Sequence, residues 1–472
     1  MQNQTEKLSI KEKIGFSLGD YASNLFFQTF ILFLLIFYTD VFGLPAAAVG
    51  TMFLVTRIWD AFFDPIIGII SDRTQTRWGK FRPFLLWFAL PFAVIGVLTF
   101  TTPGFNTTGK LIYAYISYSF MMMIYSAINV PYSALMGVIT SNSEQRVVLS
   151  SYRFVAAFSG GFTVQGVTLY LVSYFGHGNV QLGWQLAMAA IAGLAFVAFM
   201  ITFLTTNERV NPPKGQKTEF KVDLKDLFKN KPWLLIAGAT VFQLIYIVMR
   251  SSSISYYFKY YVGTQQWDLF GHNFNMSIDD LTSTFLMSGT IATVVGAILT
   301  NWFSKIFDKK QTYLGFLIIS AILCALFYFL SPQNITLMYI INLLVSFFFG
   351  PVSVLQWAMY TDAADFSEWT NNRRATGLIM AASLFALKLG LSLGGALVGW
   401  ILAYHNYIAN AVQSAESLNG IRMLMSFYPA VFGIIGGLLM LFYPLTNKMM
   451  IKIEEDLTAR RKDSKPDLVE AS

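Results

Sequence analysis

Charged residues are scarce in this sequence. Only 12% of its 472 residues are Asp, Glu, Lys or Arg, whereas a soluble domain carries about 25%. Hydrophobic residues make up 55% of the chain. This balance excludes an ordinary water-soluble protein and predicts a membrane protein.

Cysteine and histidine are scarcer still. The single cysteine, Cys324, excludes an intrachain disulfide and a cluster of thiolate metal ligands. The three histidines, His177, His272 and His405, all fall in predicted loops. We therefore expect no zinc site.

Motifs for nucleotide or covalent chemistry are missing as well. The sequence holds no Walker motif, nucleophile elbow, HExxH or CxxC pattern. We expect neither an enzyme nor a cofactor, and any transport must draw on an ion gradient rather than ATP. The net charge of +7 lies mostly between apolar runs, so topology explains it better than nucleic-acid binding does. Residues 1–13 lack the apolar core of a signal peptide, so we expect no removable leader.

Long apolar runs are what the sequence has in abundance. A membrane-spanning helix needs about 20 mainly apolar residues. Twelve segments meet this description: 15–39, 46–70, 83–102, 109–138, 149–173, 183–206, 232–262, 280–303, 312–330, 335–362, 376–404 and 418–446.

The loops between these segments alternate in charge. Those after even-numbered segments are rich in Lys and Arg, whereas the opposite loops contain only Lys110. Because cytoplasmic loops carry the excess of basic residues, we expect both termini in the cytoplasm. A multi-pass membrane protein follows.

The longest polar interruption, 207–231, divides the chain into equal halves. We expect an all-α membrane protein with twelve transmembrane helices in two pseudo-symmetric six-helix bundles, which is the major facilitator superfamily fold. The bundles are expected at 1–206, with the cation site, and 232–446. A cytoplasmic loop at 207–231 joins them, and a charged, disordered cytoplasmic tail covers 447–472.

Three carboxylates lie inside the first two apolar segments. Asp20, Asp60 and Asp64 must each be neutralised by a proton, a cation or a partner, because a charge at membrane depth is costly. At 100° per residue, Asp60, Asp64 and Arg57 share about 60° of one helix face. Ser126 adds a neutral oxygen, so the natural use is to hold a coupling ion. An internal salt bridge to Arg57 or Arg153 is the alternative.

Isolated cations occur in three later helices. Arg153 could neutralise the acidic cluster and hydrogen-bond a polar solute with its planar fork. Lys388 lies in mid-helix, where snorkelling to the surface is not available, so we expect it to face a cavity. Arg250 either lies opposite Tyr256 or Tyr257, or pairs with an anionic substrate.

Aromatic and amide side chains complete the substrate candidates. Tyr125, Tyr152 and Trp357 could stack on a sugar, although aromatic residues are so common here that packing is the alternative for each. The full set of substrate-binding candidates is Asp20, Tyr125, Asn129, Arg153, Arg250, Trp357 and Lys388.

A basic loop at 71–83 has two interpretations. It can anchor the chain by its positive charge, or it can latch onto acids at the cytoplasmic end of the tenth predicted helix. The expected gating residues are Arg77, Arg82, Asp362, Asp365, Glu368 and Arg373.

Several motifs together resemble one transporter family. They are Gly19-Asp20-Tyr-Ala-Ser, Tyr38-Thr-Asp40, Arg57-Ile-Trp-Asp60-Ala-x-x-Asp64-Pro, Arg77-Trp-Gly-Lys80-Phe-Arg-Pro, Gln356-Trp-x-Met-x-x-Asp362-x-x-Asp365-Phe-x-Glu368-Trp and Lys388-Leu-Gly. The chain resembles the glycoside–pentoside–hexuronide:cation symporters, which include melibiose permease, xyloside transporters and glucuronide transporters. The resemblance implies that sugar and cation bind near the midplane between two bundles, with alternating access.

The resemblance also implies roles for single residues. Asp60, Asp64 and Ser126 match the cation site of melibiose permease, with Ser126 in place of a Thr. Asp20 and Arg153 match its sugar-binding pair, and Lys388 matches a functionally important lysine.

Three positions depart from that pattern. Phe63 replaces an Asn of the cation site, Asn129 replaces a sugar-contacting Asp, and Ser133 replaces a sugar-stacking Trp. The first change leaves the choice between sodium and proton open. The other two mean that galactoside specificity is not implied.

The leading hypothesis is a secondary active transporter that couples uptake of a glycoside, pentoside or hexuronide to entry of sodium or protons. A lipid or lysolipid translocator of the same fold, or a non-transporting sugar sensor, are the alternatives. The expected partners are a small sugar, a monovalent cation and the lipid bilayer, and a monomer is expected to suffice.

Overall fold

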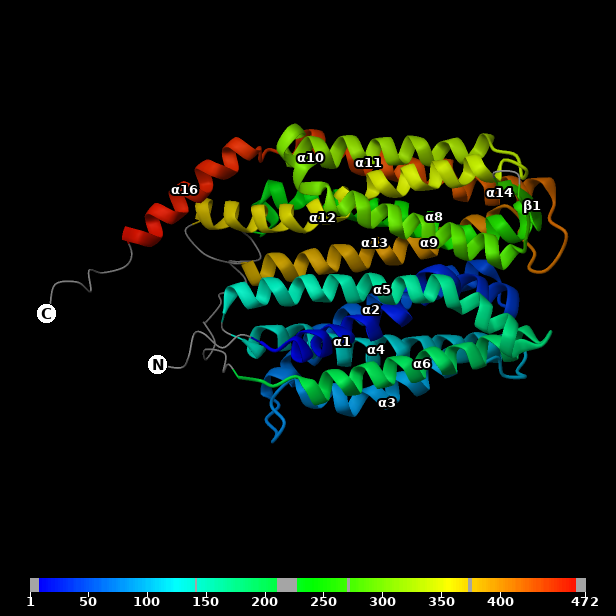
Figure 1. Ribbon diagram of the computed structural model, residues 1–472, viewed down its shortest axis with the longest axis horizontal. Coiled ribbons are helices and arrows are strands. Elements are labelled where there is room, and N and C mark those ends of the chain that lie inside the picture. The colour runs from blue at the N-terminus through cyan, green and yellow to red at the C-terminus, as the bar shows by residue number, and fades with distance from the viewer. Residues whose placement is uncertain (1–7, 141, 210–226, 270–271, 372–375, 464–472) are drawn as a thin grey trace, which may run out of the picture. The chain divides into compact units, whose positions relative to one another are not determined.

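The computed structural model describes residues 8–140, 142–209, 227–269, 272–371 and 376–463, and nearly all of them are helical (Figure 1). The first part of the chain forms α1 (Ile10–Thr29), the π-helical turns η1 (Phe30–Leu34) and η2 (Phe37–Val41), α2 (Ala46–Arg73), α3 (Arg82–Thr99), α4 (Thr107–Ile139), α5 (Ser143–Gly176) and α6 (Val180–Thr205).

The second part begins with α8 (Lys231–Tyr256), η3 (Tyr257–Val262), β1 (Gln265–Leu269), β2 (His272–Met276), α9 (Ile278–Ile298) and α10 (Thr300–Phe307). It continues with α11 (Lys309–Ala325), η4 (Leu326–Phe329), α12 (Ile335–Asn371), α13 (Thr376–Tyr404), α14 (Ala415–Met425), α15 (Phe427–Leu439), η5 (Met440–Phe442) and α16 (Asn447–Asp463).

Ten helices within the described residues are long and apolar enough to cross a membrane. The protein is therefore a multi-pass, all-α membrane protein. The first two predicted spans are helical as well, in α1 with its π-helical turns and in α2, but they are not among these ten. Length and hydropathy alone thus do not establish the predicted count of twelve transmembrane helices.

Polar side chains fix where several helices begin. Asn106 accepts a hydrogen bond from the backbone N–H of Gly109 at 2.8 Å and starts α4, and Asn179 does the same for α6 through Leu182 at 3.1 Å. Such caps satisfy backbone donors that have no partner within the helix.

The first of two compact units contains Met1–Lys214, Ser251–Met287 and Gly395–Arg422. In it α1 packs against α5 and α6, α3 against α4 and α6, and α2 against α4 (Figure 1). A Cβ on Gly50 of α2 would lie 2.6 Å from the carbonyl oxygen of Ala396, and one on Gly399 would lie 2.5 Å from that of Ala46. Small residues therefore bring α2 and α13 into backbone contact.

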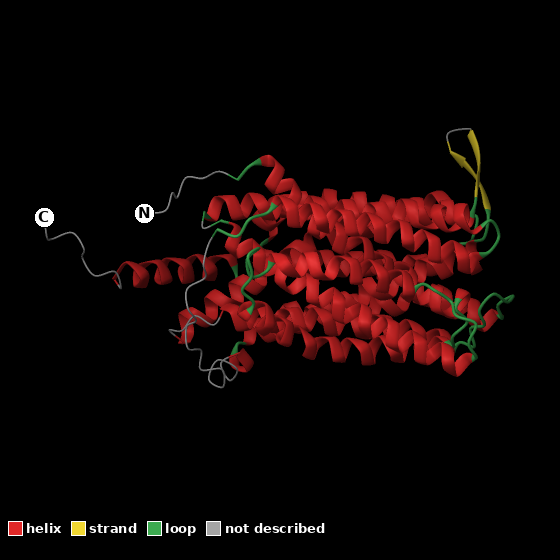
Figure 2. Cartoon of the chain, turned by 90° about the horizontal axis from the view of Figure 1, so that it is seen from below, coloured by secondary structure: helices red, strands yellow, loops and turns green. Residues whose placement is uncertain are grey.

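This unit is larger than the predicted bundle 1–206, because it takes in the ends of α8, α9 and α13. It also includes a hairpin in the 263–279 connection, in which β1 and β2 pair antiparallel with Trp267 opposite Phe274. Figure 2 shows these two strands as the only yellow segment among the red helices.

The second unit contains Gly215–Arg250, Ser288–Gly394 and Met423–Ser472. In it α11 packs against α12 and α15, and α16 packs against α12. The prediction of a disordered tail is wrong for 447–463. Ile453 and Leu457 are buried, and the Trp369 indole N–H donates to Asp456 at 2.9 Å, which ties α16 to α12.

Candidate functional site

Asp20 and Arg153 form a two-pronged ion pair between α1 and α5. Arg153 Nε lies 2.5 Å from Asp20 Oδ2, and Nη2 lies 3.0 Å from Oδ1. The Tyr132 hydroxyl adds a third donor to Asp20 Oδ2 at 2.7 Å. The side chains of Arg153 and Asp20 remain 22% and 16% exposed. A solute can therefore reach a pair that is held in fixed geometry.

Two glycines bring these helices close enough for the pair to form. A Cβ on Gly160 of α5 would lie 2.7 Å from the carbonyl oxygen of Tyr21, and a Cβ on Gly19 would lie 2.3 Å from the Tyr132 ring. No side chain fits at either position without displacing a neighbour. The short distance between Asp20 and Arg153 thus depends on the close packing that these two glycines allow.

Asn129 lies on α4, facing α1. Its amide oxygen accepts a hydrogen bond from Ser23 at 2.6 Å, and its amide nitrogen donates to the Tyr125 carbonyl at 2.9 Å. In this arrangement it orders α4 against α1. Its role as a substrate ligand remains a prediction.

Asp60 and Ser126 lie in direct contact, as the cation-site prediction expects. Ser126 Oγ donates to Asp60 Oδ1 at 2.8 Å, and both residues are almost fully buried. Arg57 hydrogen-bonds Tyr118 and lies close enough to attract Asp60. Asp64 and Phe63 are half-buried on the next turn of α2. Asp60 is therefore a buried carboxylate between a hydroxyl donor and a nearby guanidinium.

Tyr125 lies between the two acidic centres. It is within electrostatic range of Arg57, Asp20, Asp60 and Asp64, and its ring contacts Phe92 at a centroid distance of 6.1 Å. A group at this place senses the charge state of both centres.

Arg250 is buried within the second unit. It is 4% exposed, and its Nη2 donates to Asn342 Oδ1 at 2.5 Å. Its guanidinium also lies 5.8 Å from the centre of the Phe327 ring. Burial against Asn342 and Phe327 places Arg250 within the helix packing, and its role as a ligand for an anionic substrate remains a prediction.

Lys388 and Trp357 also belong to the second unit. Lys388 is half-buried on α13. Trp357 is 38% exposed and packs edge-on against Tyr360. Both keep exposed surface for a ligand, and their substrate roles remain predictions.

The basic loop before α3 surrounds Glu208, an acid that the sequence analysis did not identify. Glu208 accepts backbone hydrogen bonds from Lys80, Phe81 and Arg82 at 2.8, 2.8 and 2.9 Å, at the positive end of the helix. Gly79 has φ +109°, and a Cβ there would lie 2.4 Å from Glu208 Cδ. The only sequence signal is an isolated acid that opens a long basic stretch.

The predicted gating residues have partners within their own units. Arg82 Nη2 donates to the Phe203 carbonyl at 2.7 Å, and the exposed Arg77 stacks on Trp78 at 4.4 Å. Asp362 binds Lys309 at 2.8 Å, and both residues belong to the second unit. Asp365 and Glu368 are half-buried, and Arg373 lies outside the described residues. The latch itself remains a prediction.

Asp40 forms a second ion pair, at the helix ends opposite the basic loops. Its side chain is 2% exposed and pairs with Lys259 Nζ at 2.5 Å. The hydroxyls of Tyr260 and Tyr407 also donate to it. Asn410 joins by accepting from Lys259 at 2.8 Å and donating to the Asp40 carbonyl at 2.5 Å. We name these five residues the Asp40 clamp.

The clamp joins three segments that are far apart in the sequence. They are the end of the first helix, the end of α8 and the connection after α13. Burial, together with Tyr256 and Asp40, raises the pKa of Tyr407 far above its ordinary value. Tyr407 therefore stays a neutral donor, and the clamp keeps its hydrogen bonds across the physiological pH range.

The chain is similar to known transporter sequences over almost its whole length. Residues 15–447 match the family described as MFS/sugar transport protein. The inner membrane symporter YicJ of Escherichia coli is 37% identical, with 96% of each chain covered. The isoprimeverose transporter of Lactiplantibacillus pentosus is 36% identical over 94% of this chain and 91% of its own. The glucuronide carrier protein homolog of Escherichia coli is 31% identical over 97% of both.

Solved structures show the same fold at much lower identity. A bacterial homolog of the human lysosomal transporter Spinster aligns with a TM-score of 0.68 and 14% identity, covering 94% of this chain and 99% of its own. The nucleoside transporter NupG aligns with a TM-score of 0.60 and 13% identity, over 92% of this chain and 100% of its own. At these identities the likeness concerns the fold alone.

Proposed function

Because the chain belongs to the MFS/sugar transport protein family, within its glycoside–pentoside–hexuronide:cation symporter branch, we propose that it takes up a sugar together with a cation by alternating access. It is a transporter of the bacterial inner membrane rather than an enzyme, with both termini in the cytoplasm. A single copy carries the complete site.

One observation carries this proposal. A solute-accessible Asp20–Arg153 pair and a buried Asp60–Ser126 pair lie in the same compact unit, with Tyr125 in range of both. The first offers bidentate hydrogen bonding to a polar solute. The second offers a carboxylate that must be neutralised within the membrane. Coupled transport needs these two functions to lie close together.

The substrate we propose is a neutral glycoside or pentoside. Arg153 is already neutralised by Asp20, and Arg250 is only 4% exposed, which keeps its charge away from a solute such as a uronate. The relatives named isoprimeverose transporter and putative glycoside/cation symporter support a glycoside. Asp20 and Arg153 of the first unit are its proposed ligands.

The coupling ion we propose is a proton. Sodium needs several oxygen ligands, and Asp60, Asp64 and Ser126 supply few, while Phe63 supplies none. Protonation neutralises Asp60 or Asp64 without any further ligand.

Alternating access needs a gate on each side of the membrane. The Asp40 clamp lies opposite the basic loops, on the side that the positive-inside rule places outside. Holding three helix ends together there blocks entry from outside, so the clamp must open before a sugar binds from that side.

Counterflow in proteoliposomes tests sugar recognition without any gradient. Vesicles are preloaded with one sugar from a panel of xylosides, glucosides, galactosides and glucuronides, and entry of the same sugar in labelled form is measured. Neutral pentosides or glycosides should drive transient accumulation. Counterflow with glucuronides alone would contradict the neutral substrate, and none with any sugar would contradict sugar transport.

A further inference from the structure

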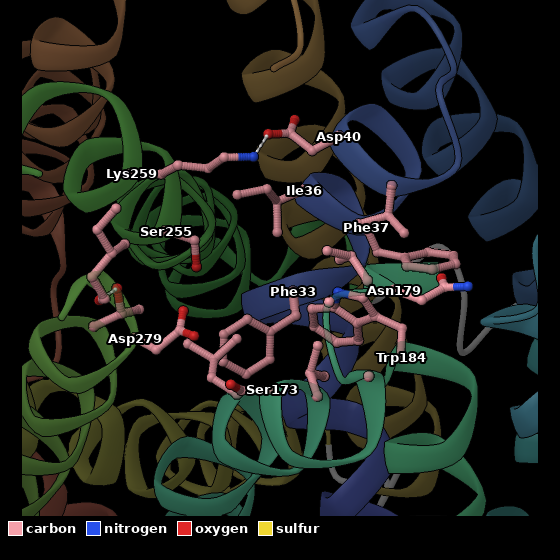
Figure 3. A pocket seen from close by; sticks show the side chains of 18 residues that line it. Phe33, Ile36, Phe37, Asp40, Ser173, Asn179, Trp184, Ser255, Lys259 and Asp279 are labelled. Carbon is pink, nitrogen blue, oxygen red and sulfur yellow. Dashed lines mark hydrogen bonds and ion pairs between the residues drawn. The ribbon is translucent and has the colours of Figure 1, made fainter. Parts of the chain in front are cut away.

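A cavity of about 310 Å³ lies in the first unit, next to the Asp40 clamp (Figure 3). Its walls come from the end of the first helix, α5, α6, the end of α8 and the start of α9. The Asp20–Arg153 and Asp60–Ser126 pairs are not among its lining residues. Its volume falls at the lower end of sites that bind small organic molecules, about 300–1,000 Å³.

One wall of this cavity is aromatic. Phe33 and Phe37 are fully buried and Trp184 is 4% exposed, with ring centroids of Phe33 and Phe37 lying 5.9 and 5.8 Å from that of Trp184. Figure 3 shows the three side chains gathered on one side. These packed rings leave almost no exposed area, so they make this wall rigid and fix the shape of the cavity.

Ser255 supplies a buried polar atom on another wall. It is 6% exposed, and its hydroxyl has no hydrogen-bond partner among the described residues (Figure 3). A helical serine ordinarily donates to a carbonyl one turn earlier. A buried hydroxyl without a partner costs free energy, and a ligand hydroxyl in the cavity would satisfy it.

Charges of both signs line the same space. Lys259 keeps 33% of its side chain exposed while it holds Asp40, and the Asp279 carboxylate is exposed at the first turn of α9. A donor, an acceptor and a hydroxyl beside aromatic rings match the alternating donors and acceptors of a sugar. An acyl chain would leave the Ser255 hydroxyl without a partner and would bind neither charge.

We propose that this cavity is a second sugar subsite, which receives one ring of the transported glycoside beside the closed clamp. The inference rests on the proposed function, because it takes a sugar to be the transported solute. A sugar hydroxyl that binds Lys259 competes with Asp40 for the ammonium. Occupancy of the subsite therefore loosens the clamp before the sugar moves inward.

Saturation-transfer NMR with methyl β-D-xylopyranoside tests the subsite on the purified full-length protein. The Asp20→Asn variant disables the inner pair, and Arg153→Gln serves as a second variant with the same purpose. Weak saturable binding should persist in both. Adding Ser255→Ala and Asp279→Asn should then weaken it at least fivefold, whereas the control Asp268→Asn, a hairpin carboxylate away from the cavity lining, should not.

The outcomes separate the subsite from the function. If both inner-pair variants lose all binding while the native protein still binds, the subsite is contradicted and sugar transport stands. Residual binding that Ser255→Ala and Asp279→Asn leave unchanged also contradicts the subsite. If the native protein neither binds nor exchanges any sugar of the panel, the proposed function fails first. A variant is compared only if its melting temperature matches that of the native protein.

Discussion

Arg153 holds Asp20 through two parallel hydrogen bonds, of 2.5 and 3.0 Å, across the contact between α5 and α1. The pair is partly exposed and carries no net charge. The hydroxyls of a polar solute can therefore replace bound water on a preformed surface. Little free energy is then spent on ordering the protein.

Neutralising either partner of this pair should weaken sugar binding. Asp20→Asn or Arg153→Gln leaves the other charge partly desolvated and unpaired. We expect the dissociation constant for methyl β-D-xylopyranoside to rise at least about tenfold, or about 1.4 kcal/mol. Calorimetric titration measures it. Arg146→Gln is the control, since Arg146 on the same helix binds the carbonyls of Thr140 and Gly137. Unchanged affinity in both variants would remove the pair from the sugar site.

Removing the buried carboxylate should separate exchange from accumulation. In Asp60→Asn the ion-binding group is permanently neutral, so sugar exchange should continue while gradient-driven uptake is lost. Asp64→Cys should behave in the same way. Uptake and counterflow in matched vesicles measure the two activities. The control is Ser159→Ala, because the Ser159 hydroxyl donates to the Val155 carbonyl of its own helix. Concentrative uptake by Asp60→Asn would rule out its role in coupling.

Replacing Phe63 should change the coupling ion. Phe63→Asn adds an amide oxygen beside Asp64, and hard oxygen donors suit sodium. We expect sodium to stimulate uptake by this variant several-fold at pH 7.5, whereas the native protein responds to pH and not to sodium. Phe63→Leu, which adds no oxygen, is the matched control. Sodium stimulation of the native protein would contradict proton coupling.

Weakening the Asp40 clamp should open the outer end. Asp40→Asn removes the charge that holds Lys259, Tyr260 and Tyr407. A cysteine at Asn24, one turn beyond Asp20, reports on access in a Cys324→Ser background. Membrane-impermeant maleimide added from outside should label it several times faster in Asp40→Asn than in the parent. Asp268→Asn is the control, and equal rates in all three would exclude a gating role.

A substitution at Gly79 should destabilise the loop around Glu208. Gly79→Ala combines a positive φ with a Cβ 2.4 Å from the Glu208 carboxylate, and such strain costs about 1–3 kcal/mol. The melting temperature should fall by several degrees. Gly104→Ala provides the control, because a Cβ there meets nothing within 4 Å. Equal melting temperatures would show that the loop adapts.

The sequence predicted the fold well, because the fold depends on strong local signals. Apolar runs revealed the spans, and carboxylates within them revealed the acidic centres. The family resemblance and the predicted major facilitator fold are confirmed. The contacts of Asp60 with Ser126 and of Asp20 with Arg153 are present in the structure.

Partners distant in the sequence escaped prediction. Tyr132 reaches Asp20 only because Gly19 lets α4 approach α1, and Glu208 reaches the loop before α3 across more than a hundred residues. Neither pairing leaves a periodic pattern to read. The motif around Asp40 was visible, but its partners on α8 and after α13 were not. The tail helix α16 likewise depends on contacts with α12 rather than on its own sequence.

Uptake of labelled methyl β-D-xylopyranoside into membrane vesicles, with sodium and pH gradients imposed independently, tests the central claim most directly. Cation-coupled transport through the Asp60 centre predicts that an inward proton gradient drives accumulation above equilibrium, and that an uncoupler or Asp60→Asn abolishes it. Accumulation that persists after both gradients are dissipated would contradict it.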